Sequence, residues 1–203
     1  MLEIKKERGI IMGQRTAILV KRNFKDGTSE TRLIHYQWGF GKTMVAHFMQ
    51  EFLKSQYNYN PYDKTLKNYF KFDTRKNYTY KKSKKNVNVW DIGTVQKWFD
   101  ITDNNNGGMV VEITEEDSKY SFRLQDVKIG FLIGDEECEY NWDKEEYVNE
   151  KPFERFVSSN EYMYRTGGET YCPKMFRLSF NGFCETFGIK EIVKDNFENT
   201  LDK

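Results

Sequence analysis

The alternation of apolar and polar residues predicts a β-hairpin near the start of the chain. Residues 15–24 are rich in β-forming side chains around an apolar centre, and residues 25–28 (Lys-Asp-Gly-Thr) are typical of a turn. Residues 29–38 alternate, with Leu33 and Ile34 on opposite faces. We therefore predict two antiparallel strands joined through residues 25–28.

A helical repeat follows the hairpin. In residues 42–56 the apolar side chains recur three to four positions apart, which predicts an amphipathic helix. We expect this helix to pack on the sheet through Phe48 and Phe52.

Three further segments have helical character. They are residues 64–70, residues 90–99 with Asp91 as the N-cap, and a helix whose first turn holds Pro152. The helix capped by Asp91 would bury Val95, Trp98 and Phe99. The helix at Pro152 would cover Phe153, Phe156 and Val157.

Four more segments have strand character, namely residues 109–114, 120–124, 127–133 and 175–180. We expect the first two to pair across a turn. The third is the most apolar run, so we expect it to lie centrally. Together these elements predict an α+β fold with a mixed, mainly antiparallel sheet and two to four packed helices.

The expected domain organisation is simple. Residues 12–188 form a single α+β domain, and residues 189–203 form a polar tail that is at most a frayed helix. The codons of residues 5–9 can form a purine run shaped like a ribosome-binding site, so we hypothesise that translation begins at Met12. Residues 1–11 would then be a non-native extension, and a genuine short edge strand is the alternative.

Composition limits the class of protein. Of the 203 residues, 38% are hydrophobic and 16% are aromatic, so Phe, Tyr and Trp must build much of the core. Charged residues make up 31% and the mean hydropathy is -0.82, which excludes an integral membrane protein. Three cysteines are too few for a disulfide framework, and no signal peptide is visible. We expect a cytoplasmic protein without a membrane partner.

No motif specifies a catalytic reaction. Residues 39–43 (Gly-Phe-Gly-Lys-Thr) lie between a strand and a helix, as the end of a phosphate-binding loop does. However, Tyr36 stands where that loop needs a glycine. A structural turn is the main interpretation, with a simple anion contact as the alternative.

Metal and nucleophile chemistry have little support. His35 and His47 are the only histidines, and no cysteine has zinc-site spacing near either. The oxygen ligands to consider are Asp103, Asn104 and Asn106 in one loop, and Glu112, Asp126 and Asp135 near strand ends. We predict no catalytic residue, no metal site and no cofactor, and retain a metal-dependent nuclease as an alternative.

Charge is distributed unevenly along the chain. Residues 1–90 hold 19 Lys and Arg against 7 Asp and Glu, a net charge of +12. Residues 91–203 hold 13 against 24, a net charge of -11, so the overall +1 conceals a basic half and an acidic half. This division favours binding to charged partners, or self-association through complementary faces.

The basic half concentrates in residues 64–85, where cations alternate with aromatic rings. Cations neutralise phosphates and rings stack on unpaired bases, so this segment is a candidate nucleic-acid-binding site. A solvated lysine loop and contact with an acidic protein surface are the alternatives. The candidate residues are Lys64, Lys67, Tyr69, Lys71, Arg75, Lys76, Tyr78, Tyr80, Lys81, Lys82, Lys84 and Lys85.

The acidic half concentrates in residues 135–150. Carboxylates between aromatic residues can dock on a basic groove, although a solubilising surface explains them equally. The candidate partner-binding residues are Asp135, Glu136, Glu137, Glu139, Tyr140 and Trp142.

The segments MGQRTAILVK and IHYQWGFGK, within residues 12–42, resemble the openings of uncharacterised small proteins of Gram-positive bacterial phages. The resemblance implies a phage or mobile-element source and no particular chemistry. With the charge division, it suggests a non-enzymatic accessory protein that binds and inhibits a nucleic-acid-handling protein of the bacterial host or its defence systems. Direct nucleic-acid binding through residues 64–85 is the main alternative.

Overall fold

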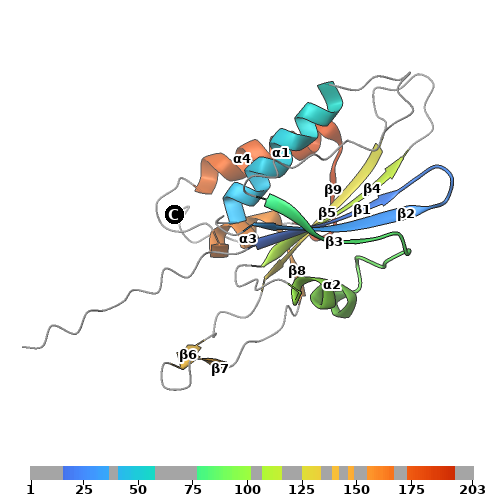
Figure 1. The fold of residues 1–203 in the computed structure, drawn as a ribbon. Coiled ribbons are helices and arrows are strands. Elements are labelled where there is room, and N and C mark those ends of the chain that lie inside the picture. The colour runs from blue at the N-terminus through green and yellow to red at the C-terminus, as the bar shows by residue number, and fades with distance from the viewer. Residues whose placement is uncertain are drawn as a thin grey trace, which may run out of the picture.

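A mixed β-sheet forms the centre of the molecule (Figure 1). The computed structural model describes residues 16–36, 41–57, 77–101, 107–115, 125–133, 139–141, 146–148, 155–166 and 173–194. The seven strands of this sheet are β1 (Thr16–Asn23), β2 (Ser29–Tyr36), β3 (Asn77–Ser83), β4 (Gly108–Glu115), β5 (Gln125–Ile133), β8 (Arg155–Val157) and β9 (Lys190–Glu191). With the helices, they confirm the predicted α+β class.

The sheet is mixed because β1 has one antiparallel and one parallel neighbour. The strand order is β3-β2-β1-β4-β5-β8, and β9 pairs with β5 in parallel. β1 runs antiparallel to β2 and parallel to β4. A separate two-stranded sheet contains β6 (Glu139–Asn141) and β7 (Glu146–Val148).

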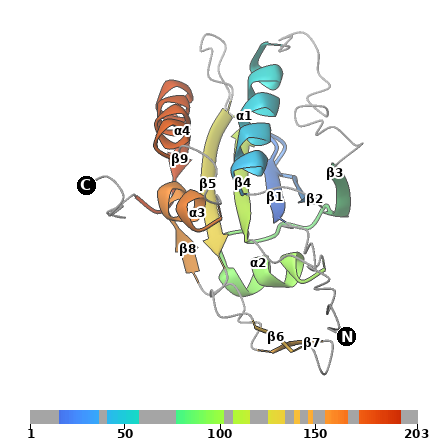
Figure 2. The same ribbon diagram turned by 90° about the vertical axis from the view of Figure 1, so that its left-hand side faces the viewer.

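Helices cover both faces of the sheet (Figures 1 and 2). Three helices, α1 (Gly41–Tyr57), α3 (Ser159–Thr166) and α4 (Pro173–Phe187), pack on one face, whereas α2 (Ile92–Phe99) packs on the other. Alternation along β2 divides the core accordingly, since Ile34 lies in the first cluster and Leu33 in the second.

The predicted hairpin is confirmed. Its turn has Gly27 at φ 79°, a conformation that glycine adopts without strain. The Asp26 carboxylate accepts hydrogen bonds from the backbone N (2.9 Å) and the hydroxyl (2.6 Å) of Thr28. This aspartate turn fixes which residues of β1 and β2 oppose each other.

The predicted helices over residues 42–56 and 90–99 are confirmed as α1 and α2. Phe48 and Phe52 join the core beneath α1. Asp91 caps α2 by accepting a hydrogen bond from the Thr94 backbone N at 2.8 Å. The side chains predicted to point inward, Val95, Trp98 and Phe99, are buried.

For two segments, the predicted secondary structure differs from the observed one. The helix expected at Pro152 is wrong for Phe156 and Val157, which belong to strand β8 and pair with β5. The strand expected over residues 175–180 is wrong, because those residues lie in α4. In α4, Phe180 and Phe183 are buried at helical spacing and Pro173 stands at the start, where proline suits a helix.

The strand pairing near β5 also differs from expectation. β4 pairs with β5 rather than with residues 120–124, which lie outside the described residues. Pairing with the more apolar strand buries more apolar surface. The frayed helix expected after Ile189 is wrong for Lys190 and Glu191, which form β9. The helix expected over residues 64–70 lies outside the described residues.

Candidate functional site

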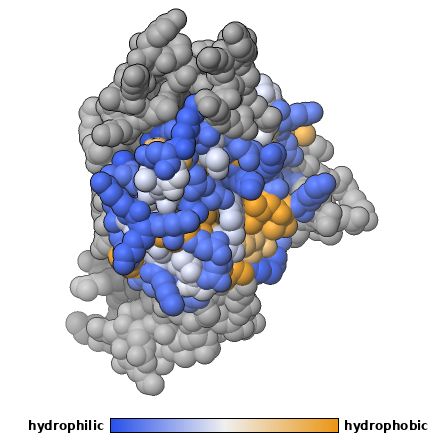
Figure 3. Space-filling view, turned by 90° about the vertical axis from the view of Figure 1, so that its right-hand side faces the viewer, coloured by the Kyte–Doolittle hydropathy of each residue, from blue (hydrophilic) through white to orange (hydrophobic). Residues whose placement is uncertain are grey.

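A groove of about 680 Å³ lies where the β1–β2 hairpin meets β3. We call it the hairpin groove. Five cationic side chains and three carboxylates line it, which gives a formal charge of +2. Figure 3 views the molecule from the side of the hairpin turn, where the described surface is mainly hydrophilic. The lining residues are Arg22, Phe24, Lys25, Asp26, Thr28, Ser29, Glu30, Arg32, Lys82, Lys84 and Glu115.

Strand register gathers these charges on one face of the sheet. Arg22 of β1 lies opposite Glu30 of β2, and Arg32 of β2 lies opposite Lys82 of β3. Val20, two residues before Arg22 on the same face, is buried in the core under the helices. The face therefore changes from apolar to charged towards the hairpin turn.

Glu30 is the centre of the groove's ion pairs. Its carboxylate accepts hydrogen bonds from Arg32 Nε and Lys82 Nζ, both at 2.5 Å. Burial pushes the pKa of Glu30 upwards, but the bonds from Lys82 and Arg32 outweigh burial, and the pKa lies below its usual value. Glu30 is therefore ionised at neutral pH and separates two cations that would otherwise repel each other across the ladder.

Arg22 forms a separate ion pair in the groove, with Glu115. Its guanidinium lies 3.3 Å from a Glu115 oxygen and 5.0 Å from the centre of the Phe24 ring. The Arg22 and Glu115 side chains are only 8% and 7% exposed. This pair is therefore nearly buried, whereas the side chain of Lys82 is 44% exposed.

The basic segment predicted from the sequence is divided between the two faces of β3. Lys82 and Lys84 line the hairpin groove. Lys81 points to the other face, where its Nζ lies 4.7 Å from the Trp98 ring of α2. Lys85 is exposed beyond the end of β3.

The other predicted residues are only partly described. Tyr78 and Tyr80 belong to β3, where a register shift against β2 marks a bulge. Glu139 and Tyr140 belong to β6. The rest lie outside the described residues: Lys64, Lys67, Tyr69, Lys71, Arg75, Lys76, Asp135, Glu136, Glu137 and Trp142.

Sequence reasoning missed the hairpin's contribution to the groove. Arg22, Lys25 and Arg32 come from β1, the turn and β2, far from residues 64–85 in the chain. Strand alternation gave only a partial signal, because Arg22 lies three residues before the predicted turn and Glu30 two residues after it, whereas the structure pairs the two residues. Only the pairing of β2 with β3 brings Lys82 beside them.

A second polar cluster lies on the opposite face of β1 and β4. Glu112 accepts hydrogen bonds from Trp90 Nε1 (2.6 Å) and Asn23 Nδ2 (2.9 Å), and pairs with Lys21 Nζ at 3.2 Å. Burial raises the pKa of Glu112, but these partners outweigh burial and hold the pKa below its usual value. Glu112 was a candidate metal ligand, and here its oxygens are occupied by protein donors.

Of the remaining metal and nucleophile candidates, Asp103, Asn104, Asn106 and Asp135 lie outside the described residues. Asp126 and Cys184 take structural positions. Asp126 pairs with Lys190 Nζ at 2.9 Å. Within the described part of the chain, no three potential ligands of the His, Cys, Asp and Glu types lie close enough to share a metal ion. Burial, with a contribution from Glu191, raises the pKa of the Cys184 thiol to about 12. Cys184 is therefore a protonated core thiol at neutral pH.

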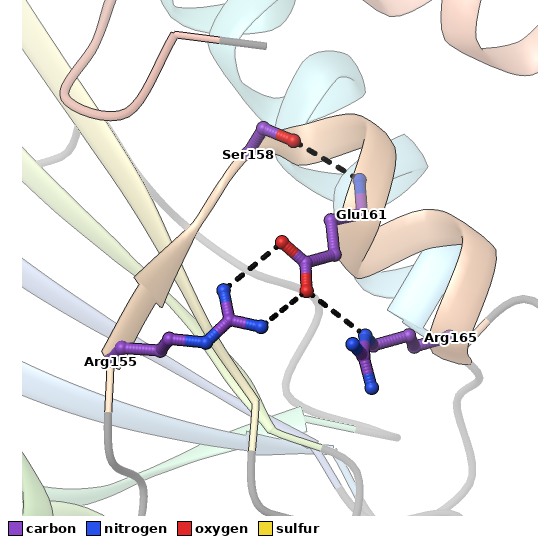
Figure 4. Close-up of polar contacts among 4 residues, drawn as sticks. All are labelled: Arg155, Ser158, Glu161 and Arg165. Carbon is purple, nitrogen blue, oxygen red and sulfur yellow. Dashed lines mark hydrogen bonds and ion pairs between the residues drawn. The ribbon is translucent and has the colours of Figure 1, made fainter. Parts of the chain in front are cut away.

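A charged cluster on α3 holds that helix against β8 (Figure 4). Arg155 donates two hydrogen bonds to the Glu161 carboxylate, at 2.6 and 3.1 Å, and Arg165 donates one at 3.0 Å. The bonds from Arg155 are the main reason that the pKa of Glu161 is lowered. Ser158 Oγ accepts from the Glu161 backbone N at 3.2 Å and caps α3.

The comparisons with known proteins do not identify a relative. No family model, no curated protein and no solved structure matches this chain. Among the described residues, no helix is long and apolar enough to cross a membrane.

Proposed function

We propose that this protein binds single-stranded nucleic acid, and that the hairpin groove contacts its phosphate backbone. The observation that carries the proposal is the convergence of Lys82 and Lys84 from the predicted basic segment with Arg22, Lys25 and Arg32 from the hairpin. Phosphate contacts by Lys and Arg supply most of the affinity of non-specific nucleic-acid binding.

The composition of the groove supports a single strand. The Phe24 ring lines the groove beside the cations, and aromatic rings stack on bases only when those bases are unpaired. The exposed side chain of Lys85 continues the positive surface past the end of β3. The volume of about 680 Å³ lies within the range of small-ligand sites, which suits one or two nucleotides at a time.

Fluorescence anisotropy with a labelled oligonucleotide tests this proposal. We expect the wild-type protein to bind a single strand more tightly than the matching duplex at low salt. The double variant Lys82→Ala/Lys84→Ala should bind the single strand roughly tenfold more weakly. The control is Lys190→Ala/Lys194→Ala, which removes the same charge beside β5. Equal losses in both variants, or no wild-type binding at low salt, would contradict the proposal.

Binding of a protein partner is a second candidate function, and the surface of α3 favours it. Tyr164 is 42% exposed on the helix that also carries Arg165. Tyrosine and arginine are enriched at interaction hot spots. The partner proposed from the sequence is a nucleic-acid-handling protein of a bacterial host, inhibited by a phage-encoded protein.

Capture from a bacterial lysate tests this second candidate. We expect the wild-type protein to retain one partner specifically, and Tyr164→Ala to lose it while keeping its fold by circular dichroism. Retention by Tyr164→Ala equal to wild type would remove α3 as the interface.

A further inference from the structure

The strongest feature of the hairpin groove beyond its net charge is the position of Glu30 between two cations. Arg32 Nε and Lys82 Nζ each lie 2.5 Å from one of its oxygens. A carboxylate held by two donors in this way presents two negatively charged acceptor oxygens, as a backbone phosphate does. The same two cations can therefore hold either Glu30 or a phosphate.

We propose that Arg32, Lys82 and Lys84 form a phosphate subsite, and that a backbone phosphate of the bound strand displaces Glu30 from its two cations. This inference rests on the proposed function and names the groups that would hold the ligand. No covalent bond forms or breaks in the exchange.

Exposure of the three side chains supports an exchange rather than a permanent ion pair. The Lys82 and Arg32 side chains are 44% and 32% exposed, whereas Glu30 is 12% exposed. Solvent therefore reaches the two cations more readily than the carboxylate that they hold. An incoming phosphate meets Lys82 first, and Lys84 lines the same groove.

The contrast with Arg22 and Glu115 places the exchange at Glu30. Those two side chains are both less than 10% exposed, and Arg22 also lies against the Phe24 ring. A phosphate therefore reaches Arg22 less readily than Lys82 and Arg32, whose side chains are 44% and 32% exposed. The ion pairs of Glu30 with Arg32 and Lys82 are therefore the ones that a ligand can open.

Glu30→Gln tests the subsite, with Glu185→Gln as the matched control on the exposed surface of α4. Removing the competing charge frees Lys82 and Arg32. We expect Glu30→Gln to bind a single-stranded oligonucleotide roughly fivefold more tightly than wild type, the equivalent of one partly exposed ion pair. Glu185→Gln should change affinity by much less, because its charge is remote from the subsite.

The outcomes separate the subsite from the proposed function. If Lys82→Ala/Lys84→Ala weakens binding but Glu30→Gln and Glu185→Gln are alike, the subsite is wrong and the function stands. If neither wild type nor Glu30→Gln binds at low salt, both are wrong. Binding by Glu30→Gln alone would contradict the exchange, since the phosphate would then fail to displace the carboxylate in the wild-type protein.

A measurement on the wild-type protein removes any dependence on the folding of the variant. The Glu30 carboxyl can be titrated by carbon NMR with and without saturating oligonucleotide. Displacement takes away the two donors that lower its pKa, so the midpoint should rise in the complex. An unchanged midpoint in the complex would overturn the exchange.

Discussion

At the scale of single residues, two glutamates on the strands that flank β1 have different surroundings and therefore different roles. Glu112 is 13% exposed at its side chain and is held by Lys21, Asn23 and Trp90. Glu30 has a similar exposure but its cation partners face the groove. A sequence alone assigns both residues to strands and cannot show which one has solvent-exposed partners.

Glu112→Gln should destabilise the protein at neutral pH. The change leaves the Lys21 charge, 10% exposed at its side chain, without its partner, so we expect a loss of roughly 2 kcal/mol. Because the folded pKa of Glu112 is lowered, its stabilisation is present above the ordinary value of 4.5 and is lost as the pH falls through the folded pKa. Urea unfolding should therefore show a gap between wild type and variant that narrows from pH 7 to pH 3.

Glu185→Gln is the control for that experiment, since Glu185 is exposed and should show little change at either pH. A gap for Glu112→Gln that is the same at pH 7 and pH 3 would mean that its charge does not stabilise the fold.

Cys184 should react with thiol reagents only when the protein unfolds. It is 9% exposed and its pKa is about 12, so very little thiolate is present at neutral pH. Labelling with iodoacetamide in a Cys138→Ser/Cys172→Ser background should be slow in buffer and fast in denaturant. Rapid labelling of the folded protein would show that the thiol is accessible.

At the scale of elements, the sequence correctly predicted a helix with a long apolar repeat and a helix whose N-cap residue directly precedes it. α1 has a helical stripe of apolar residues, and α2 has the Asp91 cap. Residues 175–180 of α4 predict a strand because apolar and polar side chains alternate there. The same residues also fit a helix. Its helical repeat becomes clear only when Phe183 and Phe187 are included.

The start of α3 directly after β8 is predictable from a capping-box pattern in the sequence. Residues 158–161 read Ser-Ser-Asn-Glu, the pattern of a capping box, and Ser158 caps α3 in the structure. The short strand β8 before it has only three residues. Residues 155–157 form a strand because they pair with β5, and the local sequence pattern does not reveal this pairing.

Ser158→Ala should destabilise the protein by about 1 kcal/mol through loss of the α3 N-cap. Ser158→Asp, which keeps an acceptor for the Glu161 backbone N, should recover most of that loss. Chemical denaturation of the two variants and wild type measures the effect. Equal stability of Ser158→Ala and wild type would show that the cap contributes nothing.

At the scale of the whole molecule, the sheet distributes the charges that the chain carries in blocks. The basic segment does not form one uniform surface, because Lys81 packs against Trp98 on one face and Lys82 enters the groove on the other. Of the candidate site, the sequence indicated the positive charge and the two lysines, Lys82 and Lys84. It could not show that the hairpin residues Arg22 and Arg32 lie near Lys82, because this proximity depends on the pairing of β2 with β3.

The central claim is that the hairpin groove binds nucleic-acid phosphates, and its most direct test is the salt dependence of oligonucleotide affinity. Each phosphate contact to a single strand contributes about 0.7 to the slope of log K against log salt. Lys82→Ala/Lys84→Ala should therefore reduce the slope by roughly 1.4, while Lys190→Ala/Lys194→Ala leaves it close to wild type. Slopes reduced equally in both double variants, or unchanged in the first, would contradict the claim.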